Sequence, residues 1–340
     1  MKIGLVICWY GKFPDYFPIW LKSCEKNNDI DFLVFTDASY NELLPQNVKL
    51  INLPFSEIVS RTKSVLGFQV SLAKPYRICD FRPIFGLIFK NELNNYDFWG
   101  YCDIDLVFGN IQGFLSKINI NELDAVFNRG HFTLIKNSDK MNNLFKCRGA
   151  LFNYKVVARH DAIFAFDENT GIQRIAMAEG VRAVYAVPYI DADGKYKQLR
   201  SRFEKDNPSH QVFYWENGIL YRAKCVDGKC YIQETMYIHL QKRELIIRDR
   251  DVLASNAFWI EPNGFSTKSY LGYPRMDDIE RYNPKASEEE MKNQVKEYRR
   301  AKLKTILSRN MFQIFVRIKQ QFAGINSDDG TKDSGLWEKY

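Results

Sequence analysis

Short apolar runs alternate with amphipathic segments through the first third of the chain, and no other feature restricts the fold as strongly. Residues 3–8, 31–36 and 48–53 have the length and apolar character of strands, whereas residues 16–26 have the apolar spacing of a helix. Strands interleaved with helices are typical of α/β domains. We therefore predict an α/β fold with a mostly parallel central sheet.

Polar loops follow three of the predicted strands. Residues 9–12 follow the first strand, Asp37 follows the second, and residues 103–105 follow a further apolar run at 96–101. Ligands of open α/β sheets bind beyond the carboxyl ends of the strands, where such loops meet. The sequence therefore predicts a binding site at one edge of the sheet.

The third loop contains an Asp-x-Asp pair. Asp103 and Asp105 follow a buried-looking strand, and Gly109 and Asn110 supply a turn behind them. Carboxylate oxygens are the ligands that Mn²⁺ and Mg²⁺ prefer, and a metal between two carboxylates can neutralise the diphosphate of a leaving nucleotide. The alternative is structural, with one carboxylate capping the turn and the other facing water.

Haloacid-dehalogenase-like phosphatases, which depend on Mg²⁺, also use an Asp-x-Asp pair after an apolar strand. That family places the motif near the N-terminus and follows it with small turn residues. Here about a hundred residues precede the pair, Leu106, Val107 and Phe108 follow it, and Asp277 and Asp278 lie in a polar, proline-containing stretch. The phosphatase is therefore the second hypothesis, behind a transferase.

Charge and cysteine content bound the remaining classes of function. The chain has a net charge of +7, but it lacks helix-turn-helix and zinc-finger patterns and any interleaving of basic with aromatic residues, so we expect no nucleic-acid partner. Its seven cysteines form no dense framework and no signal-peptide pattern precedes residue 3, which favours a reducing, cytoplasmic environment. Cys225 and Cys230 flank an Asp-Gly turn and are expected to face each other on a hairpin rather than to bind zinc.

Two segments follow the α/β part. Residues 211–240 read as a second β-rich region, and residues 287–322 read as one long helix, apolar on one side and rich in Lys and Arg on the other. That helix either packs on the protein or lies on the anionic inner face of a membrane. Residues 324–340 are expected to be disordered. Helices are also predicted from about Arg82, with Pro83 in the first turn, and at 140–148.

Three blocks resemble a bacterial family of glycosyltransferases of capsule and lipopolysaccharide biosynthesis: residues 76–83 (YRICDFRP), 97–110 (DFWGYCDIDLVFGN) and 129–137 (RGHFTLIKN). The resemblance implies a Rossmann-like GT-A fold with a β-containing acceptor-side region and a C-terminal helical tail. It divides the chain into a GT-A domain at 1–250, a connecting segment at 251–286, a basic amphipathic helix at 287–323 and a disordered tail at 324–340.

The same resemblance assigns ligands. It implies a nucleotide-sugar donor, such as a UDP-sugar, and a saccharide or lipid-linked saccharide acceptor. Asp105 would ligate the metal, and Asp103 would contact the metal or the ribose. The nucleoside would lie near Asp37 and the loop at 9–12, whose candidate donor-binding residues are Trp9, Tyr10 and Lys12.

His239 and Lys242 form a second candidate pair. In the related glycogenin-like and galactosyltransferase-like GT-A enzymes, a C-terminal His completes the metal shell and a Lys binds the diphosphate. This chain departs from that pattern, because its Lys follows the His at three residues rather than five and the flanking Gly is absent. A structural role for His239 at a strand end is the alternative.

A charged segment precedes the metal-binding strand. Lys74, Arg77, Asp80 and Arg82 resemble the residues that orient the donor in several GT-A families, and an Arg can hold phosphate through two hydrogen bonds. The alternative is an ion pair of Asp80 with Arg77 or Arg82 at the start of a helix, which would contribute little energy.

Three further residues are candidates for catalysis. His131 would lie beside the donor sugar or the acceptor, and Asp167 or Glu168 could present a carboxylate to the acceptor hydroxyl. An inverting enzyme needs such a base within hydrogen-bond reach, whereas a retaining enzyme does not. Asp167 and Glu168 as part of a plain loop are an equally good interpretation of the sequence.

Overall fold

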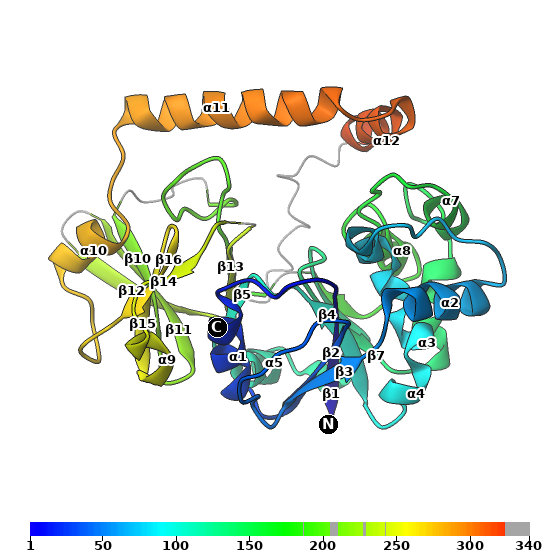
Figure 1. Cartoon of the computed structure of the whole chain (residues 1–340), viewed down its shortest axis with the longest axis horizontal. Coiled ribbons are helices and arrows are strands. Elements are labelled where there is room, and N and C mark those ends of the chain that lie inside the picture. The colour runs from blue at the N-terminus through cyan, green and yellow to red at the C-terminus, as the bar shows by residue number, and fades with distance from the viewer. Residues whose placement is uncertain (186, 205–209, 227–228, 242, 324–340) are drawn as a thin grey trace.

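The computed structural model describes the chain except for residues 186, 205–209, 227–228, 242 and 324–340 (Figure 1). The predicted disordered tail at 324–340 and the candidate Lys242 therefore lie outside the described residues. Mixed α/β architecture and C-terminal helices are confirmed. Within the described part of the chain, none of the helices combines enough length and apolar character to cross a bilayer.

Seven of the described strands form the sheet that carries the candidate site, in the order β3-β2-β1-β4-β7-β6-β8. The strands β1 to β4 pair in parallel, whereas β7 is antiparallel to both of its neighbours. The parallel register places Trp9 beside Thr36, so the first two strands end side by side. The bounds are β1 Ile3–Trp9, β2 Ile30–Thr36, β3 Val48–Asn52, β4 Phe98–Cys102, β6 Ala125–Asn128, β7 Phe132–Lys136 and β8 Ala183–Val184.

Helices cover both faces of this sheet, as expected for parallel strands that are apolar on both sides. Alternate residues of β1 point to opposite faces: Leu5 joins the apolar cluster beneath α1 and α5, and Val6 joins the cluster beneath the helices of the other face. The first face carries α1 (Phe17–Glu25) and α5 (Ile111–Lys117). Helices that contribute to the other cluster include α2 (Phe55–Leu66), α3 (Phe85–Ile88), α4 (Lys90–Leu93), α6 (Asp139–Asn142), α7 (Tyr154–Arg159) and α8 (Ile172–Ala178).

Two predicted helices are shorter than expected. Residues 75–84 form the 3₁₀ helix η1 (Pro75–Ile84), and the α-helix begins only at Phe85, because Pro83 lacks an N–H and restricts the residue before it. The helix predicted at 140–148 is divided into α6 and the 3₁₀ helix η3 (Leu144–Lys146). The remaining short turn is η2 (Ile120–Glu122).

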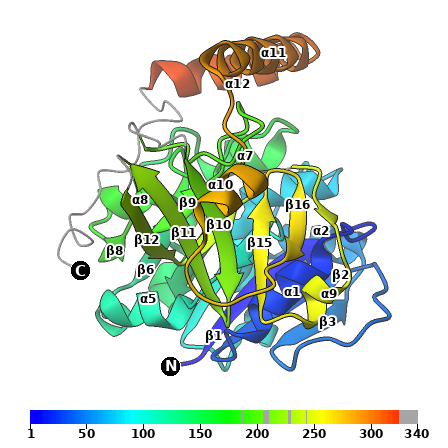
Figure 2. The same ribbon diagram turned by 90° about the vertical axis from the view of Figure 1, so that its left-hand side faces the viewer.

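A second sheet of described strands forms the other half of the molecule, in the order β12-β11-β10-β15-β16-β14 (Figure 2). The segment predicted to be a connection at 251–286 contributes two of these strands, so the β-rich region extends well past residue 250. The bounds are β10 Gln211–Glu216, β11 Ile219–Val226, β12 Lys229–Thr235, β14 Ile246–Ile247, β15 Ala257–Glu261 and β16 Gly264–Thr267, with α9 at Asp251–Ala254 and α10 at Met276–Tyr282.

Cys225 and Cys230 pair directly across β11 and β12, as predicted, and they form a disulfide. This differs from the free thiols expected in a reducing cytoplasm, where disulfides are rare. The predicted Asp-Gly turn between them, at 227–228, lies outside the described residues.

A small sheet of three described strands joins the two halves: β5 (Leu106–Phe108), β13 (Tyr237–His239) and β9 (Tyr189–Asp191). Its apolar residues, such as Val107 and Ile238, pack with Phe213 of the second sheet. The indole N–H of Trp215 donates to the carbonyl of Phe108 at 3.0 Å. This packing fixes the end of β13 against the segment that follows β4.

The C-terminal region forms two helices rather than one, α11 (Glu288–Leu307) and α12 (Met311–Phe322). Ser287 and Glu290 form a capping box at the start of α11, and the side chain of Asn310 caps the first turn of α12. The Asn310 cap explains the break, because a capping residue adopts an extended backbone that a continuous helix does not allow. In Figure 1, α11 runs along the top of the molecule and α12 lies near α7 and α8.

Candidate functional site

Strand ends bring the first group of predicted residues together. Because β1 and β2 are parallel and in register, the loop at 9–12 lies beside Asp37, and the Gly11 N–H donates to the Asp37 carboxylate at 3.1 Å. The strand β4 pairs with β1 on the other side, so Asp103 and Asp105 leave the sheet at the same edge. The predicted location of the site is thus the place where these loops gather.

Asp103, Asp105 and His239 converge at this edge. The strand β13 pairs with β5 so that His239 lies opposite Leu106, and the Leu240 N–H donates to the Asp105 carbonyl at 2.9 Å. The Nε2 atom of His239 lies 3.5 Å from a carboxylate oxygen of Asp105. One ligand atom from each of the three side chains lies within 4.8 Å of the others. Residues separated by more than 130 positions thus form one group able to hold a metal ion.

Asp191 fixes the orientation of His239. The strand β9 runs parallel to β13, and the Nδ1 atom of His239 lies 2.8 Å from a carboxylate oxygen of Asp191. The side-chain amide of Gln241 donates to the same oxygen at 2.6 Å, and Asp191 is almost completely buried. With Nδ1 engaged, Nε2 is the ring nitrogen directed at Asp105. A carboxylate behind a ligating imidazole is the usual arrangement at metal centres.

The charges around His239 favour its protonated form in the absence of a metal. Burial alone would lower the pKa of His239, but the carboxylates of Asp105 and Asp191 outweigh it and raise that pKa well above its ordinary value. Burial likewise acts to raise the pKa of Asp191, but the hydrogen bond and charge of His239 bring it down to about 2. The carboxylates of Asp105 and Asp191 therefore make this site attractive to positive charge.

Arg82 connects the Asp-x-Asp loop to the loop at 167–168. Its guanidinium donates to the carboxylate of Asp103, to a carboxylate oxygen of Asp167 at 3.2 Å and to the carbonyl of Gly130 at 2.8 Å. The planar fork of an Arg suits such bridging. One predicted donor-binding residue, Arg82, therefore lies in the site and also positions two predicted functional carboxylates.

Glu168 and Asp167 border the same site. Gly130 has φ +91 and contacts Glu168 closely, because a Cβ atom added at Gly130 would lie 2.7 Å from Cγ of Glu168. Burial raises the pKa of Glu168 to about 7, against the charge of Arg129. Burial also raises the pKa of Asp167 well above its ordinary value, against the charge of Arg82. A carboxyl with a pKa near 7 is suited to accept or donate a proton at neutral pH.

The family model of a family of unknown function, DUF6625, matches residues 5–269. The chain belongs to DUF6625. The matched range includes every described residue of the site above and ends before α11 and α12.

No curated protein matches the sequence of this DUF6625 protein significantly. Among solved structures, it is similar to the galactosyltransferase LgtC in complex with donor and acceptor sugar analogues, at 12% sequence identity and a TM-score of 0.30. The match covers 56% of this chain and 76% of that one. A likeness at this level does not establish a shared fold.

In the DUF6625 protein, Arg77 and Asp80 have structural partners instead of an open position at the site. Both are buried, and they form an ion pair with each other. Arg77 also donates to the carbonyl of His160, and Asp80 accepts the N–H groups of Phe164 and Phe166 at 2.9 and 2.8 Å. The pair fastens the segment 160–166 to η1, so the structure favours the structural alternative. Lys74 is exposed at the start of η1.

His131 is buried next to Asp103, Asp105 and His239, the group able to hold a metal ion. Its ring lies 4.4 Å from that of His239, and its Nδ1 atom is 2.9 Å from the hydroxyl of Tyr237. Burial and the charge of His239 lower the pKa of His131 well below its ordinary value, so this ring is neutral. Its Nε2 atom has no hydrogen-bond partner among the residues that the structure describes. A neutral ring nitrogen of this kind can accept or donate one hydrogen bond to a ligand.

The loop at 9–12 divides into an aromatic part and an exposed part. The ring of Trp9 is stacked on that of Phe13, and the ring of Tyr10 packs edge-on against that of Phe55, with centroids 5.1 Å apart. Lys12 is largely exposed and pairs with Asp15 at 3.0 Å. Trp9 and Tyr10 thus offer half-buried rings at the edge of the sheet, whereas Lys12 is directed toward another surface residue.

Sequence reasoning missed Asp191 and Tyr16. Asp191 ends a three-residue strand with no motif around it, and only its pairing with β13 brings it to His239. Tyr16 precedes α1. Burial raises the pKa of its hydroxyl, and the charges of Asp105 and Asp103 raise it further. Neither residue has a local sequence signal that points to the site.

Proposed function

We propose that this protein is a metal-dependent glycosyltransferase that moves a sugar from a nucleotide diphosphate sugar, in the first instance a UDP-sugar, to a saccharide acceptor. The observation that carries the proposal is the convergence of Asp103, Asp105 and His239 within 4.8 Å at the edge where the parallel strands end. This edge is where nucleotides bind in open α/β sheets. A Rossmann-like GT-A fold belongs to the same proposal.

The donor set fits Mn²⁺ or Mg²⁺. Two carboxylates and one imidazole, the latter held by Asp191, form a partly preorganised set of ligands. Mg²⁺ prefers oxygen ligands only, so the imidazole favours Mn²⁺. A bound divalent ion would neutralise the negative charge of the leaving nucleoside diphosphate.

The residues of the site can be assigned to the parts of the donor that they would contact. Trp9, Tyr10 and Asp37 would border the nucleoside. Arg82, held by Asp103 and Asp167, would border the transferred sugar, whose hydroxyls can bond to the same groups. Lys242 remains a candidate for the diphosphate.

Glu168 is the better of the two candidates for a base. Its side chain is only partly buried and is not held by Arg82, whereas Asp167 is buried and accepts from that guanidinium. A carboxylate at Glu168 could accept the proton of the acceptor hydroxyl in an inverting reaction. His131, neutral and next to His239, would contact the donor sugar or the acceptor.

The phosphatase hypothesis loses support from the position of its second acidic pair. Asp277 and Asp278 lie in the first turn of α10, which packs on the second sheet. Asp278 accepts the N–H of Arg275 and the hydroxyl of Tyr270, so it has a capping role. The acidic pair that a haloacid-dehalogenase-like phosphatase would need therefore does not join Asp103.

The acceptor in this proposal is a growing cell-surface polysaccharide or a lipid-linked oligosaccharide. Its support is the resemblance of the blocks at 76–83, 97–110 and 129–137 to enzymes of capsule and lipopolysaccharide synthesis. A lipid-linked acceptor would place the enzyme in the cytoplasm, at the inner face of the membrane.

Calorimetry with UDP, with and without MnCl₂, tests the proposal. We expect Mn²⁺ to tighten UDP binding at least about tenfold and Asp105→Asn to abolish this gain without loss of the fold, because the variant keeps the shape of the side chain and removes its charge. Asp124→Asn, at a surface ion pair with Arg182, is the matched control and should bind as the wild type does.

Equal metal-dependent UDP binding by Asp105→Asn and wild type would remove the role given to Asp105. A screen of nucleotide sugars for metal-dependent hydrolysis, run beside p-nitrophenyl phosphate, separates the two hypotheses. Turnover of the phosphate ester alone would replace the transferase with the phosphatase.

A further inference from the structure

The helix α12 is docked on the protein by one of its faces. The ring of Phe312 stacks on that of His160 with centroids 4.3 Å apart, Val316 is fully buried, and the side-chain amide of Gln320 donates to the carbonyl of Phe164 at 2.9 Å. These residues recur every four positions, which places them along one side of the helix. The position of α12 beside the 160–164 segment is therefore fixed by specific contacts.

The opposite face of α12 is apolar and exposed. The spacing of four, three and four residues along α12 keeps its members on one side, and the last turns of α11 add two exposed leucines. We call this set the outer face: Leu303, Leu307, Met311, Phe315, Ile318 and Phe322, with exposed fractions between 45% and 88%. Large apolar side chains gathered at the surface mark a site of interaction with a membrane or another protein.

The segment that carries the outer face is strongly basic. The sequence from 298 to 322 contains seven Lys and Arg residues and neither Asp nor Glu: Arg299, Arg300, Lys302, Lys304, Arg309, Arg317 and Lys319. Two of these cations lie close to the body of the protein: Arg299 lines a cavity together with Arg200, and burial, followed by the charges of Arg317, Arg202 and Lys195, lowers the pKa of Lys302. This surface is complementary to an anionic partner.

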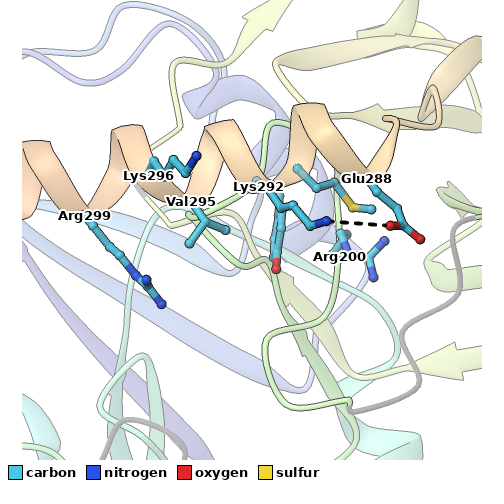
Figure 3. Close-up of a pocket in the computed structure, with 8 residues that line it drawn as sticks. Arg200, Glu288, Lys292, Val295, Lys296 and Arg299 are labelled. Atoms are coloured by element: carbon cyan, nitrogen blue, oxygen red, sulfur yellow. Dashed lines mark ion pairs between the residues drawn. The ribbon is translucent and has the colours of Figure 1, made fainter.

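The helix α11 contacts the body of the protein through polar groups, because the Lys197 N–H donates to the side-chain oxygen of Gln294 at 2.8 Å. It contains no buried residue in its whole length, all of which the structure describes. A cavity of about 500 Å³ lies between α11 and the segment at 196–200, and Figure 3 shows Lys292, Lys296 and Arg299 along the helix with Arg200 below. Glu288 pairs with Lys292 at 3.9 Å, where both side chains are exposed. Apolar packing on the protein therefore does not explain α11.

We propose that the outer face lies on an anionic lipid bilayer, with its apolar side chains among the acyl chains and the exposed basic residues of the same segment, such as Arg300, Lys304 and Lys319, among the headgroups. Amphipathic helices with Lys and Arg beside large apolar residues bind in this way. A second copy of the chain fits less well, because pairing through this face would bring two strongly basic segments together. The inference does not depend on the reaction catalysed.

The docked face of α12 relates this surface to the candidate site. Phe312 and Gln320 contact residues 160–164, which lead directly into the loop of Asp167 and Glu168. The charge of Glu168 also acts on Arg317. A bilayer against the outer face would thus lie on the side of the molecule where Glu168 is found.

Vesicle co-sedimentation of the full chain, without metal or nucleotide, tests the proposal. We expect the wild type to bind vesicles that contain phosphatidylglycerol, and to bind phosphatidylcholine vesicles much more weakly. The triple variant M311Q/F315Q/F322Q should lose at least about tenfold in partitioning, because three apolar side chains leave the outer face. L43Q/L271Q/Y273Q, which replaces exposed apolar residues elsewhere, is the matched control and should bind as the wild type does.

Circular dichroism and thermal melting would check that both triple variants remain folded. Binding of M311Q/F315Q/F322Q equal to that of the wild type would overturn the proposal, as would a wild type that ignores phosphatidylglycerol. Analytical ultracentrifugation measures the oligomeric state and so tests the alternative of a second copy. If the wild type forms a dimer and M311Q/F315Q/F322Q does not, the outer face is a dimer interface instead of a membrane-binding surface. Because no reaction is measured, failure here leaves the proposed glycosyl transfer untouched.

Discussion

The Nδ1 atom of His239 lies 2.8 Å from a carboxylate oxygen of Asp191, which leaves Nε2 facing Asp105. The contact depends on two short strands, β9 and β13, that pair in parallel although they lie about 50 residues apart. Gln241 donates to the same carboxylate and limits its rotation. His239 is therefore held in one orientation before any ligand arrives.

Asp191→Asn should weaken Mn²⁺ binding about 10–100-fold, the usual effect of losing a carboxylate behind a ligating imidazole. The side chain keeps its size, so we expect the fold to persist. Titration of Mn²⁺ followed by electron paramagnetic resonance measures the affinity without any need for turnover. Asp193→Asn, in the same segment but paired with Lys195, serves as the control. An unchanged Mn²⁺ affinity in Asp191→Asn would show that Asp191 has no part in positioning the imidazole.

The residues that the sequence did predict share a local signal. Asp37, Asp103 and Asp105 each follow an apolar run, and the parallel pairing of β2, β1 and β4 places all such ends at one edge. His239 was found by its resemblance to a known ligand pattern, and the structure brings it to the acidic pair. The spacing of apolar residues and the position of a residue at the end of a strand are properties of short segments, so both can be predicted without knowledge of the tertiary fold.

The residues that were missed or misread depend on contacts distant in sequence. Asp191 reaches His239 only through the pairing of β9 with β13. The sequence predicts a donor-binding role for Asp80, whereas its carboxylate accepts the N–H groups of Phe164 and Phe166, more than 80 residues away. The amphipathic pattern of the tail is compatible with packing on the protein and with membrane binding, because one helix can pack on the protein by one face and expose an apolar face on another side. In α12, Val316 packs on the protein and Phe315 faces outward.

Gly130→Ala should impair catalysis as well as stability. The residue has φ +91, which a side chain tolerates poorly, and its Cβ would lie 2.7 Å from Cγ of Glu168. We expect a loss of about 1–3 kcal/mol in the free energy of unfolding and, because Glu168 must move, a further fall of about 10–100-fold in the rate of transfer. Gly272→Ala is the matched control, since Gly272 has φ +90 and open space around it.

Chemical denaturation and the rate of nucleotide-sugar turnover would be measured on both glycine variants. Both variants should lose stability through the positive φ, and Gly130→Ala should lose at least as much because its Cβ also meets Glu168. If Gly130→Ala also kept the wild-type rate, the contact between Gly130 and Glu168 would be irrelevant to the reaction.

The pH dependence of activity should reveal Glu168. Burial raises its pKa to about 7, so the carboxylate is available as a base only above that pH. We expect kcat/KM to rise toward a plateau above about pH 7, and Glu168→Gln to be slow and to lose this limb while still binding UDP. A pH profile of Glu168→Gln with the same limb would move the role to Asp167 or to another group.

The same pKa has a consequence for stability, with a defined sign. The unfolded chain releases the Glu168 proton near the ordinary value of 4.5, whereas the folded protein retains it up to about 7. The folded state therefore binds more protons between these values, and stability falls as the pH rises from about 4.5 to about 7. Melting curves should show a weaker fall in Glu168→Gln than in the wild type over this window.

Glu204→Gln should destabilise the second sheet, because Arg222 is completely buried and its guanidinium donates to both carboxylate oxygens of Glu204, at 2.5 and 2.6 Å. Burial acts to raise the pKa of Glu204, but the hydrogen bonds and charge of Arg222 outweigh it and lower that pKa. The stabilisation is therefore present above the ordinary value of 4.5 and is lost as the pH falls through the native pKa. We expect the variant to lose about 1–3 kcal/mol at pH 7, toward the low end because Glu204 is 36% exposed. Urea unfolding at pH 7 measures this loss.

Asp15→Asn, at the exposed pair with Lys12, should change stability by less than about 0.5 kcal/mol, and equal effects of the two substitutions would show that burial of Arg222 does not matter.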